Sequence, residues 1–413
     1  VENINFRGRN IKVAGADRET TFIDGNENGS VVVFENGIEF NQYQDAVLKN
    51  FTITNGNGWA DGSGIKLYYF SSPTLSDLII TNNTSYQSGG GISCESFCHP
   101  IIENVIISNN TSASAGGVMC WGGSNPTLTN VTITGNTATT DYGGGLYCNG
   151  SSPVLKNVTI ADNSANMFGG GIYIYASSAP TLDQVTITGN MANENGGGLY
   201  LDQNNNVNVL NTILWNNGPQ EIFLTGESDT ITVAYSDVLD GQASVITNGG
   251  SINWGTGNID VDPMFVDTAN GDFSLLPDSR LIDTGHPDST DADGTIADMG
   301  AYYYNQAGQP VRVQKITTPP PATNIALKWP ANTESDLAGY NVYRSIDPNA
   351  DFYNMSQYAT SPDSFYVDET AEDNTTYHYR VSAVDSESDE GIFAFARHGR
   401  TGNDTTALSM GAD

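Results

Sequence analysis

The stretch Gly143–Asn163, GGGLYCNGSSPVLKNVTIADN, contains the pattern that decides the fold of this 413-residue chain. A glycine run precedes a short apolar segment, a turn with a proline, and a second apolar segment that ends at an asparagine. The pattern occurs four times between Ser88 and Asn217. Equivalent residues lie 26 or 27 positions apart: Pro73, Pro100, Pro126, Pro153 and Pro180, and Asn83, Asn110, Asn136, Asn163, Asn190 and Asn217. A fixed period of this length is typical of a solenoid.

Apolar and polar residues alternate within each repeat, as in NVTITGN at 130–136. Such alternation in segments rich in Thr, Val, Ile and Tyr predicts β-strands. The strands of one coil cannot bury their apolar face alone, so they must stack on the next coil. The sequence therefore predicts an all-β protein built on a parallel β-helix. Two inner columns are predicted: Ile65, Ile92, Val118, Leu146, Ile172 and Leu199, then Leu67, Cys94, Cys120, Cys148, Ile174 and Leu201.

Polar columns flank the second strand of each repeat. The asparagines from Asn83 to Asn217 form one column; the other contains Asn50, Asp77, Asn104, Asn130, Asn157, Gln184 and Asn211. We expect these side chains to bond backbone groups that turn away from the sheets. Because three of the four cysteines fall on an inner column, we expect buried, reduced thiols. A disulfide that involves Cys98 and a metal site near His99 remain as alternatives.

The composition limits the range of partners. Asp and Glu number 47 against 15 Lys and Arg, which gives a net charge of −32. So acidic a chain is not expected to bind nucleic acid or anionic membrane surfaces. No apolar run approaches the 18 or more residues that a membrane span needs. The first residues resemble the inside of a strand, so we expect an earlier coil or cap in a longer precursor.

The chain is predicted to contain two structured regions. Residues 1–315 would form the β-helix, which closes with an irregular Asp-rich segment at 271–300. A proline-rich linker follows at 316–323, and residues 401–413 form a tail. Between them, residues 324–400 contain alternating strands typical of an antiparallel β-sandwich. Its predicted core contains Trp329, Tyr340, Val342, Tyr377, Tyr379 and Val381.

Several strings carry a resemblance to known families. The GGGLY and NVTITGN repeats, with FIDGNENGSVVVFENG at 22–37 and NIDVDPMFVD at 258–267, resemble secreted bacterial right-handed parallel β-helix proteins. These include pectate-lyase-like and polymorphic outer-membrane-type repeat proteins, and the likeness covers about three quarters of the chain. TTYHYRVSAVD at 375–385 resembles a fibronectin type III module, with Tyr377 at the tyrosine-corner position. The resemblance implies a secreted or cell-surface bacterial protein, but this fold supports many activities.

Outward-facing aromatic residues provide the main functional candidate. Alternation places five aromatic side chains on the outer face of consecutive coils, where sugar rings could stack on them. They are Trp121, Tyr147, Tyr173, Tyr175 and Tyr200. The alternative is that these tyrosines only stabilise the sheet. We therefore expect a non-catalytic scaffold for adhesion, glycan contact or extracellular assembly. Its partner would be a polysaccharide or cell-surface protein, with homo-assembly also open.

An enzyme is the first alternative function. A uronate lyase needs a base, usually Arg or Lys, and no Arg occurs between Arg18 and Arg280. A glycosidase needs two carboxylates about 5–9 Å apart. The outward acids Glu95 and Asp202 would lie on coils too distant for that. Outward Thr-x-Thr pairs such as Thr132/Thr134 also suggest an ice-binding solenoid, but Ile and Ala interrupt the array.

The closing segment suggests a calcium site. Four of its acids form the candidate ligand set: Asp288, Asp291, Asp293 and Asp298. Calcium prefers six to eight oxygen ligands in flexible loops, and DADGT at 291–295 supplies two carboxylates beside a sharp bend. Five acids within 283–298 would repel each other without a counter-ion. A solvated acidic loop with Asp-Gly turns is the alternative.

Overall fold

The computed structural model describes residues 2–35, 45–59, 61–305, 325–329, 337–346, 356–368, 370, 376–386 and 399–400. The chain divides into two compact units, Val1–Tyr304 and Asn305–Asp413. The linker predicted at 316–323 and the tail at 401–413 lie outside the described residues. Among those described, no helix is long and apolar enough to cross a bilayer.

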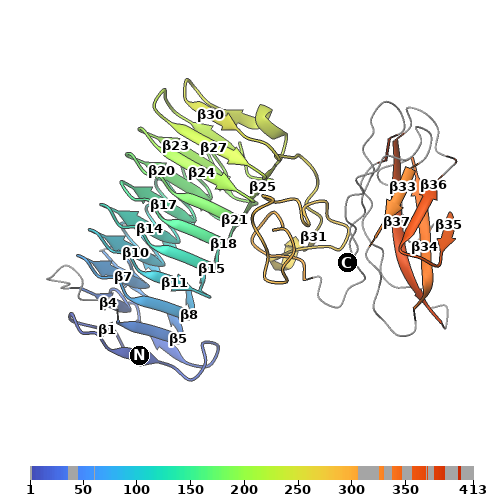
Figure 1. Cartoon of the computed structure of the whole chain (residues 1–413). Helices are drawn as coiled ribbons and strands as arrows, with labels where there is room; N and C mark the ends of the chain where they lie inside the picture. Colours follow the sequence, from blue (N-terminus) through green and yellow to red (C-terminus); the bar gives the residue numbers. More distant parts are fainter. Residues whose placement is uncertain are drawn as a thin grey trace. The chain divides into compact units, whose positions relative to one another are not determined.

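Three parallel sheets form the first unit, with coils stacked along its length (Figure 1). Sheet 1 contains β1 (Ile4–Asn5), β4 (Val32–Phe34), β7 (Ile65–Tyr68), β10 (Ile92–Glu95), β14 (Val118–Trp121), β17 (Leu146–Asn149), β20 (Ile172–Tyr175), β23 (Leu199–Asp202), β26 (Ile222–Leu224) and β29 (Val245–Ile246). Sheet 3, the shortest in strand length, contains β6 (Asn57–Gly58), β9 (Thr84–Ser85), β13 (Thr111–Ser112), β16 (Thr137–Ala138), β19 (Ser164–Ala165) and β22 (Met191–Ala192).

Sheet 2 is the longest and completes each coil. Its main path contains β2 (Lys12–Ala14), β5 (Val47–Thr54), β8 (Thr74–Thr81), β11 (Ile101–Glu103), β15 (Thr127–Thr134), β18 (Val154–Ala161), β21 (Thr181–Thr188), β24 (Asn206–Leu210), β27 (Thr230–Ala234) and β30 (Ser251–Trp254). Short strands pair beside it: β3 (Phe22–Asp24), β12 (Ile106–Ser108), β25 (Ile213–Trp215) and β28 (Asp237–Val238). The closing segment adds the hairpin β31 (Phe265–Asp267) and β32 (Asp272–Leu275), with short 3₁₀ helices at Gly241–Ser244 and Thr268–Asn270.

The inner columns confirm the predicted register. Ile92 pairs with Ile65 and Val118, and Cys94 pairs with Leu67 and Cys120. The same pairing continues through the later coils to Leu199 and Leu201. All twelve predicted inner residues of these two columns are fully buried in one continuous core. Stacking identical positions is therefore how each coil covers the apolar face of its neighbour.

Buried asparagines connect the coils at the turn between sheets 2 and 3. The amide nitrogen of Asn110 donates to Asn136 Oδ1 at 3.0 Å, and Asn136 repeats this bond to Asn163. Each side-chain oxygen also accepts the backbone N–H of the preceding asparagine. The column ends at Asn217, whose amide donates to Glu221 Oε2. These bonds confirm the predicted role, because they pair backbone groups that the turn removes from the sheets.

Glycine stands beside this asparagine column because the coils approach each other closely there. A Cβ atom at Gly117 would lie 2.4 Å from the carbonyl oxygen of Gly145. At Gly145 it would lie 2.7 Å from the carbonyl oxygen of Gly171. No larger residue fits at these distances without moving backbone. The glycine run in each repeat therefore sets the spacing of the coils at this corner.

The second unit contains a small antiparallel sheet. Its order is β35 (Ala359–Ser361), β34 (Leu337–Ser345), β37 (Thr376–Asp385) and β38 (Gly399–Arg400), beside the pair β33 (Ile325–Lys328) and β36 (Phe365–Asp368). Its core includes all six residues predicted from the sequence. The described strands establish an antiparallel sheet, while its assignment to the fibronectin type III class stays a prediction.

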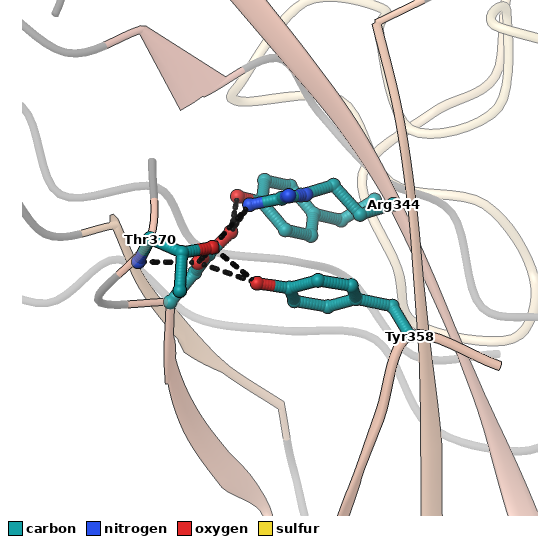
Figure 2. Close-up of polar contacts among 5 residues, drawn as sticks. Arg344, Tyr358 and Thr370 are labelled. Carbon is teal, nitrogen blue, oxygen red and sulfur yellow. Dashed lines mark hydrogen bonds and ion pairs between the residues drawn. The ribbon is translucent and has the colours of Figure 1, made fainter. Parts of the chain in front are cut away.

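A buried carboxylate organises the polar side of this small sheet. Figure 2 shows the polar groups of Arg344, Tyr358 and Thr370 close together. All three residues are hydrogen-bonded to Asp368, which is fully buried. Arg344 donates at 2.6 Å to one carboxylate oxygen, and the Thr370 backbone N–H donates at 2.9 Å to the other. Tyr379 also donates its hydroxyl to Asp368. Burial alone would raise the pKa of Asp368, but these bonds outweigh it and lower the pKa.

The four cysteines are free and buried, as predicted. Burial raises the pKa of the Cys98 thiol, and the thiolate is the reactive form. We therefore expect a soluble thiol reagent to leave the native protein unlabelled and to label four thiols after denaturation. Mass spectrometry of both samples measures this. Rapid labelling of Cys94, Cys120 or Cys148 in the folded protein would contradict the inward placement of that column.

Replacing Asp368 with asparagine should destabilise the small sheet. The change leaves the Arg344 guanidinium beside a neutral group, and breaking a buried ion pair typically costs about 3–5 kcal/mol. We expect calorimetry to show an earlier or absent transition for the second unit and an unchanged transition for the β-helix. Asp363→Asn, at an exposed position, is the matched control and should leave both transitions unchanged. Equal melting of D368N and wild type would show that the network contributes little.

Candidate functional site

The outer face of sheet 1 is the candidate site. Strand pairing places two outward columns side by side. The first contains Lys66, Ser93, Met119, Tyr147, Tyr173, Tyr200 and Phe223. The second contains Tyr68, Glu95, Trp121, Asn149, Tyr175 and Asp202. All five aromatic residues predicted from the sequence therefore lie on this face.

Loop aromatics cover part of the first column. Tyr142 stacks on Tyr173 with ring centroids 4.5 Å apart, and Phe168 stacks on Tyr200 at the same distance. Tyr173 and Tyr200 are consequently only 4% and 6% exposed. The prediction that they belong to one exposed strip is wrong. Tyr142 and Phe168 each directly precede a glycine run, a repeated aromatic position that lies outside the strand alternation.

The other predicted residues remain accessible to different degrees. Trp121 is 46% exposed, while Tyr147 and Tyr175 are half-buried. The Asn149 amide donates to the Tyr147 hydroxyl at 3.0 Å, and burial raises the pKa of Tyr147 to about 12. Tyr147 also contacts Tyr173 edge-on, with ring centroids 5.1 Å apart. Trp121 therefore stands beside a rigid aromatic stack and offers the most accessible ring of the predicted set.

Further exposed aromatics flank the first coils of this face. Trp59 and Tyr86 stack at 4.5 Å in the turns that lead into sheet 1, and they are 78% and 52% exposed. On the other side of the strands, Phe70 and Phe97 stack at 5.4 Å in the turns that leave sheet 1. Strand alternation does not predict these four residues, because they lie in turns. Their paired spacing, 27 residues in each case, was the available signal.

Glu95 is the acid on this face whose pKa is clearly shifted. Its side chain accepts a hydrogen bond from Ser93 Oγ at 2.6 Å and is almost completely buried. Burial raises its pKa above the ordinary value, with a further increase from Asp61 and an opposing decrease from Lys66. Asp202 stands four coils away in the same column, as the sequence predicted. The two acids therefore do not form a pair across one sugar unit.

Three of the four predicted calcium ligands accept hydrogen bonds within the chain, whereas Asp288 is exposed. Asp291 accepts from the Gln184 amide at 2.7 Å and from the Asp298 backbone N–H. Asp298 accepts the backbone N–H groups of Asp283 and Tyr304, and Asp293 accepts from Thr295. Within the described residues, no three acidic, His or Cys side chains converge as metal ligands. Calcium binding here stays a prediction, and it would require these carboxylates to exchange N–H donors for the ion.

The threonine face of sheet 2 does not form an open array. Thr159, Thr186 and Thr188 are buried, and the Ala301 backbone N–H donates to Thr186 Oγ1 at 2.9 Å. The closing segment thus crosses the later coils and covers their threonines. An ice-binding surface needs a flat accessible array, and this arrangement interrupts it.

Comparison with known proteins agrees with this architecture. The profile of a family described as "Right handed beta helix region" matches residues 1–137, 36–193 and 116–262, which together cover more than half of the chain. The chain belongs to the right-handed β-helix family. Among solved structures, pectate lyase Pel9A is similar over 74% of this chain and 97% of its own, with 12% identity and a TM-score of 0.32. No curated protein matches the sequence.

Two acids at the end of this right-handed β-helix also have raised pKa values. Burial raises the pKa of Glu221 to about 7 and that of Asp237 to about 8. Glu221 accepts the last bonds of the buried asparagine column. Asp237 accepts from the Val261 backbone N–H, and its second oxygen is buried without a partner among the described residues. Perturbed acids often mark catalytic sites, but both groups are enclosed between coils.

Replacing Asp237 with asparagine should stabilise the β-helix increasingly as pH rises. The folded protein holds Asp237 protonated up to about pH 8, whereas the ordinary value is 3.8. Between these values the folded state binds more protons, so stability falls with rising pH, by on the order of 1 kcal/mol per pH unit. Asparagine cannot ionise and removes this loss. Urea unfolding should show no gain near the ordinary pKa of 3.8 and a growing gain towards about pH 8.

The exposed carboxyl of Glu227 provides the control for this measurement. Glu227→Gln should preserve the pH dependence of the wild type. If D237N and wild type lose stability in parallel between these pH values, then Asp237 is ionised in the folded protein.

Proposed function

We propose that this right-handed β-helix is an extracellular, surface-associated scaffold that binds a polysaccharide through the outer face of sheet 1. The observation that carries the proposal is the exposed Trp121 ring, with half-buried Tyr147 on the next coil. Sugar rings present apolar faces that stack on such aromatic groups. The edge-on contact with buried Tyr173 holds the Tyr147 ring before any ligand arrives, which lowers the entropic cost of binding.

The acidity and the modular organisation support the setting. A net charge of −32 keeps the protein away from nucleic acid and anionic membranes but is compatible with neutral polysaccharide. The small antiparallel sheet would serve as a fibronectin type III-like spacer or adhesion module. A cell-surface protein and a second copy of the chain are the other partners of this proposal. Secretion or display at a bacterial surface is part of the same proposal.

A polysaccharide-cleaving enzyme is the second candidate. Glu95 favours it, because a buried carboxyl with a raised pKa can act as a general acid. Lys66 and Asp61 contribute to the field at Glu95 and would be its partners. Against this, Asp61 lies in the turn before β7, and the strand residues beside Glu95, which are Ser93, Tyr68 and Trp121, include no second acid. Binding without cleavage therefore explains more of this face.

Replacing Trp121 with alanine should weaken polysaccharide binding by roughly tenfold, or about 1.4 kcal/mol. The ring is half exposed, so the melting temperature should change little. Retention on a panel of immobilised polysaccharides measures the affinity. Phe22→Ala, which removes a 60% exposed ring outside sheet 1, is the matched control and should bind as wild type does. Equal retention of W121A and wild type on every polysaccharide would refute the site.

The same incubations distinguish the enzyme. New reducing or unsaturated ends in the presence of wild type, lost in Glu95→Gln, would replace the scaffold proposal with catalysis. We expect neither product.

A further inference from the structure

A separate cavity of about 500 Å³ lies over sheet 2, within the size range of ligand sites. Its lining brings together distant parts of the chain: Arg18, Asn104, Asn130, Asn157, Tyr302 and Tyr303. We call it the sheet 2 groove. It shares no lining residue with the aromatic face of sheet 1.

Amide groups line the groove on three consecutive coils. The Asn157 amide donates to Asn130 Oδ1, and Asn130 donates to Asn104 Oδ1, both at 3.2 Å. All three residues have positive φ, between 53° and 56°, so the backbone bends here. Asparagine tolerates that conformation better than most residues. The bend repeats on every coil and presents a row of amides at regular spacing.

The row ends with an unpaired acceptor. Gln184 occupies the next coil, but its amide turns away and donates to Asp291 instead. As a result, Asn157 Oδ1 is buried and has no hydrogen-bond donor among the described residues. A buried acceptor without a donor is unfavourable. This oxygen is closed off from the groove, so the exposed amides of Asn104 and Asn130 are the ones that present donors and acceptors to a ligand.

Aromatic rings from the closing segment complete the groove. The Gly300 backbone N–H donates to the Asn211 carbonyl at 2.8 Å, and Ala301 is bonded to Thr186. These bonds fix the segment across sheet 2 just before Tyr302 and Tyr303, which are 37% and 40% exposed. Two accessible rings thus stand beside the row of amides. Rings provide stacking surfaces and amides provide paired donors and acceptors, the combination that recognises a sugar.

Charge selects among sugars. Arg18 donates to the Asn104 carbonyl at 3.0 Å and pairs with Glu19 at 3.0 Å. Its charge is therefore balanced within the chain, and the rest of the molecule is strongly acidic. Arg18 is the one cation among the described residues that line the groove, so an acidic glycan would meet long-range repulsion with only this paired charge to receive it. A neutral glycan meets no such penalty.

We propose that the sheet 2 groove binds a short segment of a neutral glycan. Tyr302 and Tyr303 stack on its rings, and the exposed amides of Asn104 and Asn130 bond its hydroxyl groups. The groove is a second binding site on a different sheet, and the choice of ligand class rests on the proposed glycan contact of the scaffold. Two sites on one rigid rod would bind one polysaccharide with higher avidity than either alone.

The test is calorimetric titration of the full chain with soluble neutral oligosaccharides and with uronate oligomers of the same lengths. We expect binding of a neutral oligosaccharide, with little dependence on salt. Combining Tyr302→Ala with Tyr303→Ala should weaken that binding by roughly tenfold or more. Thr132→Trp, which fills the groove from β15, should do the same without removing any contact of the closing segment. Thermal melting checks that both proteins remain folded.

Trp121→Ala separates this site from the one on sheet 1. Weakening by the Tyr302/Tyr303 and Thr132 variants, but not by W121A alone, supports the sheet 2 groove. Weakening by W121A only overturns the groove and leaves the sheet 1 proposal intact. The groove proposal is wrong if neither set of variants weakens binding, if no neutral oligosaccharide binds, or if uronate oligomers bind more tightly. Binding of a protein partner through these same residues, without glycan, also overturns it.

Discussion

Every coil of this protein depends on its neighbours for the bonds that hold it together. A single coil has an apolar face that it cannot bury and turn carbonyls and N–H groups that it cannot pair. The buried asparagines resolve the second problem. Asn136, for example, donates to Asn163 Oδ1 and to the Ile107 carbonyl, so one side chain connects three successive coils. Both requirements are met only when equivalent residues stack in register.

That constraint explains which features the sequence could predict. An inner residue such as Ile133 or Cys120 has one environment, set by its copies above and below, so periodicity alone locates it. The same holds for Asn163 and for the glycine beside it. The surroundings of an outward residue are not set by the equivalent residues of neighbouring coils alone. Tyr173 was predicted on the correct face, yet its exposure depends on Tyr142, a turn residue whose position the strand alternation does not determine.

The repeat period does not predict the contacts of the closing segment either, because this segment has no equivalent in other coils. Its acids suggested an ion site because they are close in sequence and share one charge. In the structure, N–H donors from the segment itself and from Gln184 satisfy Asp291 and Asp298. Those donors come from residues up to about a hundred positions away, so no local pattern could reveal them. In the small sheet, alternation located the core residue Tyr379 but not its bond to Asp368.

Ligand binding can use only the surfaces that are not buried between stacked coils. The fold requires the inner columns and the buried asparagines, so ligand contacts must come from the outer faces and from the remaining turn residues. On sheet 1, the turns supply Tyr142 and Phe168, which cover the middle coils and leave Trp121 accessible. On sheet 2, the closing segment covers the later coils through Thr186 and leaves the row from Asn104 to Asn157 beside Tyr302. The turns over sheet 1 and the closing segment over sheet 2, rather than the sheets themselves, therefore determine where this β-helix can bind a ligand.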